Sequence, residues 1–186
     1  MTGALQTFSH FIKKGPKDLP ENYRPISLTC ICSKLLEHIV HSSISRFLES
    51  NNILSPRQHG FRAGHSCETQ LVLAIDDWAK NLNSGIRTDI AIFDFSKAFD
   101  SVPHERLLLK LHSYGIRGGT LRWVKSFLLN RLQRVTLNGA QTSWRSVTSG
   151  VPQGTVLGLL LFLLYVNDIA DGVTSEIRLF ADDCIL

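Results

Sequence analysis

The sequence predicts an α+β fold with a mostly helical N-terminal part and a C-terminal part that supplies most of the strands. Three observations support this prediction. Apolar residues recur at helical spacing through about the first eighty residues, short runs of β-forming residues follow, and strands and helices do not alternate as a doubly wound parallel sheet would require. The chain has 186 residues, 44% of them hydrophobic, which is enough for the core of one large or two small domains.

Two amphipathic helices are expected in the N-terminal part. Apolar side chains three and four positions apart predict the first over residues 33–50 and the second from Leu71 to Leu82, with Gly85 just beyond its end. The polar, glycine-bearing segment 55–66 would be the loop between them. The first fifteen residues show no periodic pattern, and we expect them to be irregular.

A short run of β-forming residues, Ile90-Ala91-Ile92-Phe93-Asp94-Phe95, predicts a buried strand with one carboxylate near its end. Pro103 suits the first turn of a helix that continues to about Tyr114 and is closed by Gly115. A further helix is expected over residues 120–129.

Two strands, 133–137 and 143–147, are expected on either side of Asn138-Gly139, a dipeptide typical of hairpin turns. The glycine-flanked loop 150–154 precedes the apolar stretch 156–166. This stretch falls well short of the roughly 20 residues that a membrane span requires, so it predicts a buried helix. A last pair of strands would flank the two adjacent acidic residues near the C-terminal end.

Charge, cysteine spacing and the N-terminal residues narrow the class of protein. The net charge of +4 is compatible with a polyanionic partner. No basic segment followed by an apolar core opens the chain, so we expect no secretory signal. The cysteines show neither C-x-x-C nor metal-site spacing and are expected to be reduced thiols of an intracellular protein of the nucleus or cytoplasm, without membrane contact. They are Cys30, Cys32, Cys67 and Cys184.

Three carboxylates are the candidates for chemistry. Asp182 and Asp183 stand between two apolar runs, so the residues that would turn a hairpin could also hold a divalent cation. If the strand that carries Asp94 lies beside this hairpin, an oxygen-rich site results, and such a site suits Mg²⁺ better than zinc. Two ions about 3.5–4 Å apart would serve phosphoryl transfer. Each motif alone also has a simpler interpretation, as turn chemistry for the acidic pair and as a strand-end cap for Asp94.

Five motifs stand in order along the chain. They are Asn22-Tyr23-Arg24-Pro25-Ile26-Ser27-Leu28, Gln58-His59-Gly60-Phe61-Arg62-Ala63-Gly64, Phe93-Asp94-Phe95-Ser96-Lys97-Ala98-Phe99-Asp100, Ser149-Gly150-Val151-Pro152-Gln153-Gly154-Thr155-Val156-Leu157-Gly158 and Phe180-Ala181-Asp182-Asp183. These motifs resemble those of reverse transcriptases from non-long-terminal-repeat retrotransposons of the jockey-like and CR1-like kind. The resemblance implies a right-hand polymerase fold, with fingers at about 13–88 and an incomplete palm at about 89–186. Leu159 departs from it, because the family usually has proline there.

The resemblance also implies roles for the residues around the carboxylates. Asp94, Asp182 and Asp183 would hold two Mg²⁺ ions, for which Mn²⁺ can substitute, and the carbonyl of Phe95 would complete the metal shell. Phe99 would be the aromatic gate that stacks under the incoming sugar and rejects a 2′-hydroxyl. Without the motif around it, Phe99 would be interpreted as a core residue.

Further roles concern the nucleotide and the nucleic acid. Gln153 would contact the nascent base pair, while Pro152 and Gly154 would let the backbone approach nucleic acid closely. Arg62 would grip the triphosphate, since a guanidinium meets phosphate oxygens in pairs. Arg24 is expected either to face nucleic acid or to be structural. The simpler interpretations are a helix entry for the loop and a solvated loop residue for Arg62.

These roles imply an RNA-directed DNA polymerase that uses an RNA template, a DNA primer and deoxynucleoside triphosphates. The chain ends three residues after Asp183, so we expect the thumb to be missing, and with it tight nucleic-acid binding and processive synthesis. Two alternatives stay open: a non-catalytic nucleic-acid-binding remnant of the same fold, and an RNA-dependent RNA polymerase, which Phe99 speaks against. The sequence points to no particular oligomeric state.

Overall fold

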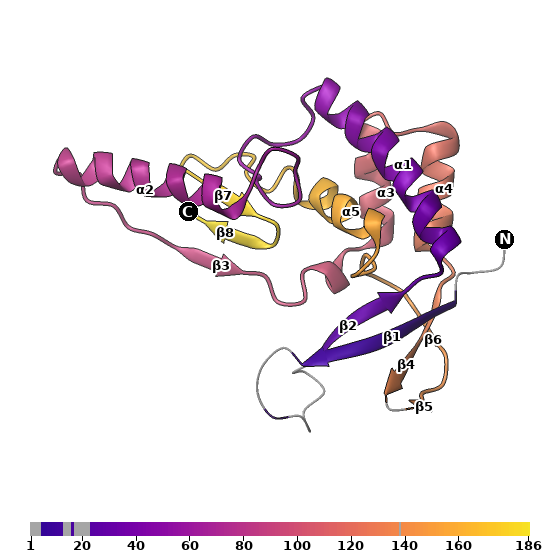
Figure 1. Cartoon of the computed structure of the whole chain (residues 1–186). Coiled ribbons are helices and arrows are strands. Elements are labelled where there is room, and N and C mark those ends of the chain that lie inside the picture. The colour runs from indigo at the N-terminus through magenta and orange to yellow at the C-terminus, as the bar shows by residue number, and fades with distance from the viewer. Residues whose placement is uncertain (1–4, 13–15, 17–22, 138) are drawn as a thin grey trace.

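The computed structural model describes residues 5–12, 16, 23–137 and 139–186, and for residues 5–12, 23–25 and 137 it describes the backbone. The helices are α1 (Ile31–Ser50), α2 (Cys67–Asn83), α3 (His104–Ser113), α4 (Gly118–Leu128) and α5 (Val156–Val166). In Figure 1, α1, α3, α4 and α5 are gathered at one side, α2 extends away over a small sheet, and a larger sheet lies below. A 3₁₀ turn lies at Phe99–Ser101.

The strands fall into two sheets. They are β1 (Leu5–Ile12), β2 (Tyr23–Leu28), β3 (Ile92–Asp94), β4 (Leu132–Leu137), β5 (Ala140–Gln141), β6 (Arg145–Ser146), β7 (Arg178–Phe180) and β8 (Asp183–Ile185). The larger sheet has the order β2-β1-β4-β5, with β6 also paired to β4, and the smaller sheet has the order β3-β8-β7. This mixture of helices with mainly antiparallel strands confirms the predicted α+β class.

The larger sheet corrects the expectation of an irregular N-terminus. β1 pairs antiparallel with β2, from Thr7 opposite Leu28 to Ile12 opposite Tyr23. It also pairs parallel with β4, beginning with Leu5 opposite Leu132. The partners that make β1 a strand therefore lie elsewhere in the chain, which is why no local pattern announced it. This sheet also joins strands from both sides of residue 88, where the fingers and palm were expected to meet.

The smaller sheet corrects a second expectation, that of a buried central strand. β3 has only three residues, lies at the edge of the β3-β8-β7 sheet and is exposed along its length. Ile92 keeps 73% of its surface exposed. The apolar composition of this run indicated the strand correctly but not its surroundings, because an edge strand contacts a neighbour on one side only.

The core gathers around α5. Seven of its eleven residues are buried, as the uninterrupted apolar run predicted, and α5 packs against α1 and α3. Fully burying one leucine or phenylalanine contributes about 1.5–3 kcal/mol, so Leu157, Leu161 and Phe162 are major contributors to the stability of this half of the molecule. Thr155 caps the helix by accepting a hydrogen bond from the N–H of Gly158 at 3.1 Å.

The apolar residues predicted for α2 form one face of a helix, but this face does not pack against the core. Ser66 and Thr69 form a capping box at its start, and the helix ends before Gly85, as expected. Leu71, Val72 and Ile75 are nevertheless exposed. α2 contacts the small sheet along β7, through an ion pair between its Asp77 and Arg178. Helical periodicity thus predicted the element correctly, whereas its burial depended on a neighbour that the described residues do not supply.

The structure also bears on the apolar helix and on the state of the cysteines. None of the helices in the described ranges is long and apolar enough to cross a membrane. All four cysteines are free thiols, and Cys184 is the buried one.

Candidate active site

Asp94 and Asp183 lie directly opposite each other on the antiparallel strands β3 and β8. Residues opposite each other on neighbouring strands have their Cβ atoms about 4.5–5.5 Å apart, and like charges in this position repel. The topology therefore brings together two of the three predicted carboxylates from positions far apart in the sequence.

Asp182 belongs to the turn between β7 and β8. Phe180 pairs with Asp183, so Ala181 and Asp182 are the two residues that reverse the chain. Ala181 has φ = +56°, a left-handed conformation that is uncommon for a residue with a side chain. The hairpin predicted around the acidic pair is therefore present, and Asp182 follows directly after its most constrained residue.

The electrostatics of Asp183 reflect its neighbours. Burial raises the pKa of its carboxyl, and the charges of Asp182 and Asp94 raise it further. All three causes disfavour the charged form of the Asp183 carboxyl, and a bound cation would stabilise that form.

The donor chemistry fits a hard divalent ion, because every side-chain donor is a carboxylate oxygen. The side chains are not in coordinating positions, however: among the described residues, no group of three His, Cys, Asp or Glu side chains is arranged to hold a metal. Gathering Asp94, Asp182 and Asp183 around an ion would therefore require these groups to move.

Phe99 lies in the 3₁₀ turn that follows β3. Its ring stacks on that of Phe162 in α5, with centroids 4.1 Å apart and planes at 27°, and the ring of Phe61 approaches edge-on at 6.4 Å. Phe99 is half-buried. This position is compatible with both interpretations of Phe99, as a core residue and as the aromatic gate. One side of the ring packs on the core, and part of the side chain stays accessible.

The glycine-flanked loop packs against the chain itself. Gly150 has φ = +88°, and a Cβ there would lie 2.8 Å from Cα of Asp100. Gly154 has φ = +82°, and a Cβ there would lie 2.9 Å from Cγ2 of Ile26. Pro152 between them is buried. The close backbone approaches in this structure are thus to the 3₁₀ turn and to β2, and an approach of Pro152 and Gly154 to nucleic acid stays a prediction.

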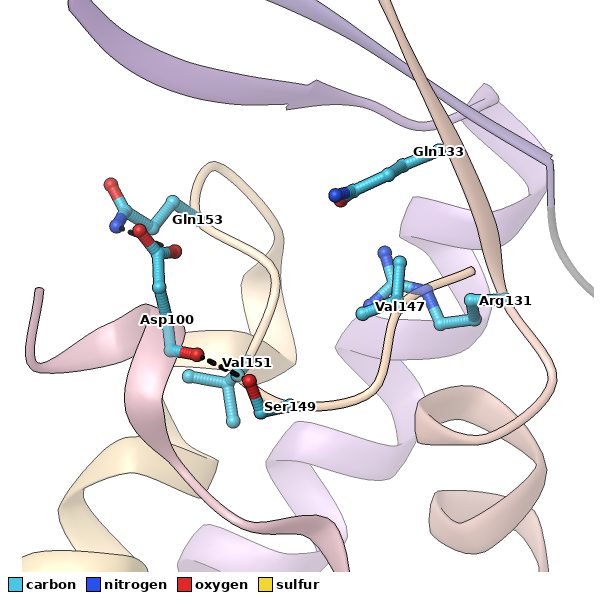
Figure 2. A pocket seen from close by; sticks show the side chains of 8 residues that line it. Asp100, Arg131, Gln133, Val147, Ser149, Val151 and Gln153 are labelled. Atoms are coloured by element: carbon cyan, nitrogen blue, oxygen red, sulfur yellow. Dashed lines mark hydrogen bonds between the residues drawn. The ribbon is translucent and has the colours of Figure 1, made fainter. Parts of the chain in front are cut away.

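Gln153 is held at both its backbone and its side chain. Its carbonyl accepts a hydrogen bond from the N–H of Ser27 at 2.9 Å, and its Nε2 donates to Oδ1 of Asp100 at 3.4 Å. Figure 2 shows both side chains at one side of a small pocket, with Gln133 of β4 and Arg131, which precedes β4, across from them. The pocket holds about 40 Å³, enough for ordered water but not for a nucleotide.

Two charged groups line this pocket. Burial raises the pKa of Asp100, an effect that Lys97 and the hydrogen bond from Gln153 oppose. Burial lowers the pKa of Arg131 to about 10, and the charge of Glu37 opposes that shift.

Arg62 is engaged within the protein. Its guanidinium pairs with Glu49 at 2.9 Å and donates to the carbonyl of Ser55 at 2.9 Å, and its side chain is only 10% exposed. A triphosphate contact would require the pair with Glu49 to open. The backbone of Arg24 pairs with that of Phe11 in the larger sheet, and its side chain lies outside the described residues.

The structure adds a residue that the sequence did not single out. Gln58 is buried, and its side chain hydrogen-bonds to the backbone of Ala181, between β7 and Asp182. The signal available in the sequence was its position at the head of the motif that includes Gly60 and Arg62.

The fold is shared with solved polymerases. It is similar to telomerase from Candida tropicalis in complex with a fragment of telomeric RNA, with a TM-score of 0.66 and 11% identity over 99% of this chain and 36% of that one. It is also similar to apo telomerase from the same organism, with a TM-score of 0.61 and 14% identity over 97% and 43% of the two chains. Identities this low show the fold alone, and the class they define is the right-hand polymerase fold.

The family follows from the sequence. Residues 12–186 match the family described as reverse transcriptase (RNA-dependent DNA polymerase), and the chain belongs to this family. Two relatives from Drosophila melanogaster are the probable RNA-directed DNA polymerases of transposon X-element, 34% identical over 90% of this chain, and of transposon BS, 30% identical over 92%. The chain spans only 19% and 20% of their lengths. The resemblance to retrotransposon enzymes drawn from five motifs is thus confirmed.

Proposed function

We propose that this chain is the fingers and palm portion of the RNA-directed DNA polymerase of a non-long-terminal-repeat retrotransposon. Family membership supports the class of enzyme. The single observation that carries the assignment of the site is the pairing of Asp94 with Asp183 beside the turn that holds Asp182. In this proposal the fingers span about 13–88 and the palm about 89–186. The enzyme would act in the nucleus or cytoplasm.

The proposed reaction joins a deoxynucleotide to a DNA primer on an RNA template. The primer 3′-hydroxyl loses its proton and attacks the α-phosphorus, a new P–O bond forms, and the bond to the β-phosphate breaks to release pyrophosphate. Divalent metal ions, which this family generally uses, would neutralise the charge on the phosphates when bound. RNA binding is consistent with the RNA complex of the telomerase that shares this fold.

The chain's own residues would bind and orient the reactants. Asp94, Asp182 and Asp183 would supply carboxylate oxygens to the metal ions, and the carbonyl of Phe95, the residue after Asp94, would complete the metal shell. The ring of Phe99, anchored on Phe162, would support the sugar and exclude a 2′-hydroxyl.

Other residues would contact the template strand and the triphosphate. Gln153, fixed through its backbone, would contact the nascent base pair alongside Pro152 and Gly154. Arg62 would reach the triphosphate after release from Glu49, and Arg24 would contact nucleic acid.

Single-nucleotide incorporation tests the proposal. A DNA primer annealed to an RNA template is incubated with the chain, one labelled deoxynucleotide and Mg²⁺ or Mn²⁺. We expect addition of one or a few nucleotides that weakens as salt increases, and a loss of at least about 100-fold in Asp182→Asn. The control is Asp171→Asn, which neutralises an exposed carboxylate outside the site. RNA binding that needs no metal, without any incorporation, would point instead to a non-catalytic remnant.

A further inference from the structure

We propose that Gln58 is a positioning residue that holds Ala181 in its left-handed conformation and thereby places Asp182 and Asp183 beside Asp94. The inference rests on the proposed function, because the position of this turn matters only if its carboxylates bind metal ions and reactants. The side-chain hydrogen bonds of Gln58 go to the backbone of Ala181 and Gly60, so it acts through the backbone of the turn.

The side chain of Gln58 satisfies both backbone polar groups of Ala181. Its Oε1 accepts the N–H of Ala181 at 2.9 Å, and its Nε2 donates to the carbonyl of Ala181 at 3.2 Å. The same Oε1 also accepts the N–H of Gly60 at 2.7 Å. Gln58 is 4% exposed, so water does not compete freely for these bonds. One side chain thus connects two segments that lie 123 positions apart.

The backbone around Gln58 aims the side chain at the turn. The carbonyl of Arg57 accepts the N–H of Leu179 at 3.0 Å, and the N–H of His59 donates to the carbonyl of Leu179 at 2.9 Å. These bonds make Gln58 and Leu179 an isolated parallel bridge at the free edge of β7. The segment therefore runs alongside the strand and reaches the turn where the strand ends.

Gly60 allows the turn to come this close. A Cβ at position 60 would collide with the backbone nitrogen of Ala181, and Gly60 is buried. Its φ is not in the left-handed region, so the need for glycine here is the space that a side chain would take. Gln58 and Gly60 thus act together on Ala181: the amide group of Gln58 bonds to its backbone, and the lack of a side chain at Gly60 leaves room for it.

The turn needs such support because its own strands are short. β7 and β8 have three residues each, and the residue between them with positive φ carries a side chain. The charges of Asp182 and Asp94 both act against the charge of Asp183. An amide meets the requirement at Ala181, because it offers an acceptor to the N–H and a donor to the carbonyl without adding charge. A glutamate would lose the donor and add a fourth carboxylate.

Hydrogen–deuterium exchange tests the hold on the turn without metal or nucleotide. We expect Gln58→Leu to increase exchange at least 10-fold in peptides covering 178–186, with no change in those covering 156–166. The matched control is Gln70→Leu: Gln70 is also buried, at 6% exposed, but neither amide atom has a hydrogen-bond partner among the described residues. This control should leave exchange in the turn within twofold of the parent chain.

A second variant guards against loss of the fold. Gln58→Asn keeps the amide but withdraws it by one methylene, so it no longer reaches Ala181, and we expect the same increase in exchange. If Gln58→Leu fails to fold, Gln58→Asn decides the question. Parent-like exchange in Gln58→Asn would overturn the inference.

Mn²⁺ affinity, measured with Mn²⁺ alone, separates positioning from a merely structural role. We expect affinity at least 10-fold weaker in Gln58→Asn at a temperature where the variant is fully folded, and unchanged affinity in Gln70→Leu. A loosened turn with parent-like affinity would overturn the positioning role. A parent chain that binds no Mn²⁺ would count against the proposed function, and exchange would then decide for or against Gln58.

Discussion

The carboxylate of Glu37 in α1 accepts a hydrogen bond from the main-chain N–H of Leu157, 3.1 Å away at the start of α5. Glu37 is completely buried, and its charge also acts on the buried guanidinium of Arg131. A carboxylate at a helix N-terminus satisfies an N–H group that has no partner within the helix, and it interacts favourably with the helix dipole. Glu37 therefore connects the central helix to Arg131, the residue that precedes β4.

Replacing Glu37 should destabilise the core. We expect Glu37→Leu to lower the free energy of unfolding by about 3 kcal/mol, because it removes the partner of the Leu157 N–H and leaves Arg131 less compensated. Urea unfolding measures the loss. Glu105→Gln, an exposed position of α3, is the control and should stay within about 0.5 kcal/mol of the parent.

The opposed carboxylates of the small sheet predict a gain of stability on neutralisation. We expect Asp94→Asn to raise the free energy of unfolding by about 0.5 kcal/mol at pH 7 without metal, because it removes a like charge opposite Asp183. The gain should shrink as salt increases. Asp89→Asn is the control, since Asp89 lies 3.4 Å from Arg87 and its loss should not stabilise the chain. A less stable Asp94→Asn would contradict this electrostatic account.

The pKa of Asp100 should depend on the two groups that oppose its burial. Lys97 and Gln153 both lower this pKa, so we expect Lys97→Met and Gln153→Ala each to raise it further, as measured by NMR titration of the carboxyl carbon. The folded pKa lies above the unfolded one. The contribution of Asp100 to stability is therefore greatest below the unfolded pKa and falls as the pH rises through the folded pKa. Asp100→Asn should flatten the stability profile in that window.

Two glycines with similar backbone angles separate conformational strain from steric conflict. Gly150 and Gly172 have φ of +88° and +76°, but a Cβ would meet backbone atoms of Asp100 only at Gly150. We expect Gly172→Ala to cost about 1 kcal/mol and Gly150→Ala at least about 2 kcal/mol more, by urea unfolding. Equal costs would show that the loop moves freely away from the 3₁₀ turn.

The ion pair of Arg62 predicts a competition between Glu49 and a triphosphate. If Arg62 contacts the nucleotide, Glu49→Gln should free its guanidinium and strengthen binding of inorganic triphosphate about 3-fold, while Arg62→Gln should weaken it about 10-fold. Calorimetry measures both. Arg106→Gln, an exposed position on α3, is the control. Weaker binding in Glu49→Gln would assign Arg62 a purely structural role.

Local patterns predicted the elements whose causes are local. The apolar run 156–166 matched α5 residue for residue, and capping and helical periodicity located α2, α3 and α4 to within a few residues. β1 was missed because its hydrogen bonds come from β2 and β4. The burial expected for β3 was wrong because composition cannot distinguish an edge strand from a central one.

The candidate site divides in the same way. The family motifs singled out Asp94 and Asp183 as candidates. In the structure these two residues lie opposite each other on β3 and β8, so the strand that carries Asp94 does lie beside the hairpin, as the sequence analysis supposed. They did not reveal that Arg62 is engaged by Glu49 or that Gln58 supports the turn. Both facts depend on contacts between segments that approach each other only in the folded chain, and a single sequence does not encode such contacts in any local spacing.

The parallel pairing of β1 with β4 has a consequence for synthesis of the chain. Leu5 leaves the ribosome long before its partner Leu132. At about 5–20 residues per second, β1 waits roughly 6–25 s with one edge open to other strands. During that interval the larger sheet can consist only of the β1-β2 pair, whose exposed edge is a template for association with neighbouring nascent chains. Completion of the larger sheet is therefore a late event, and crowding of ribosomes on one message would oppose it.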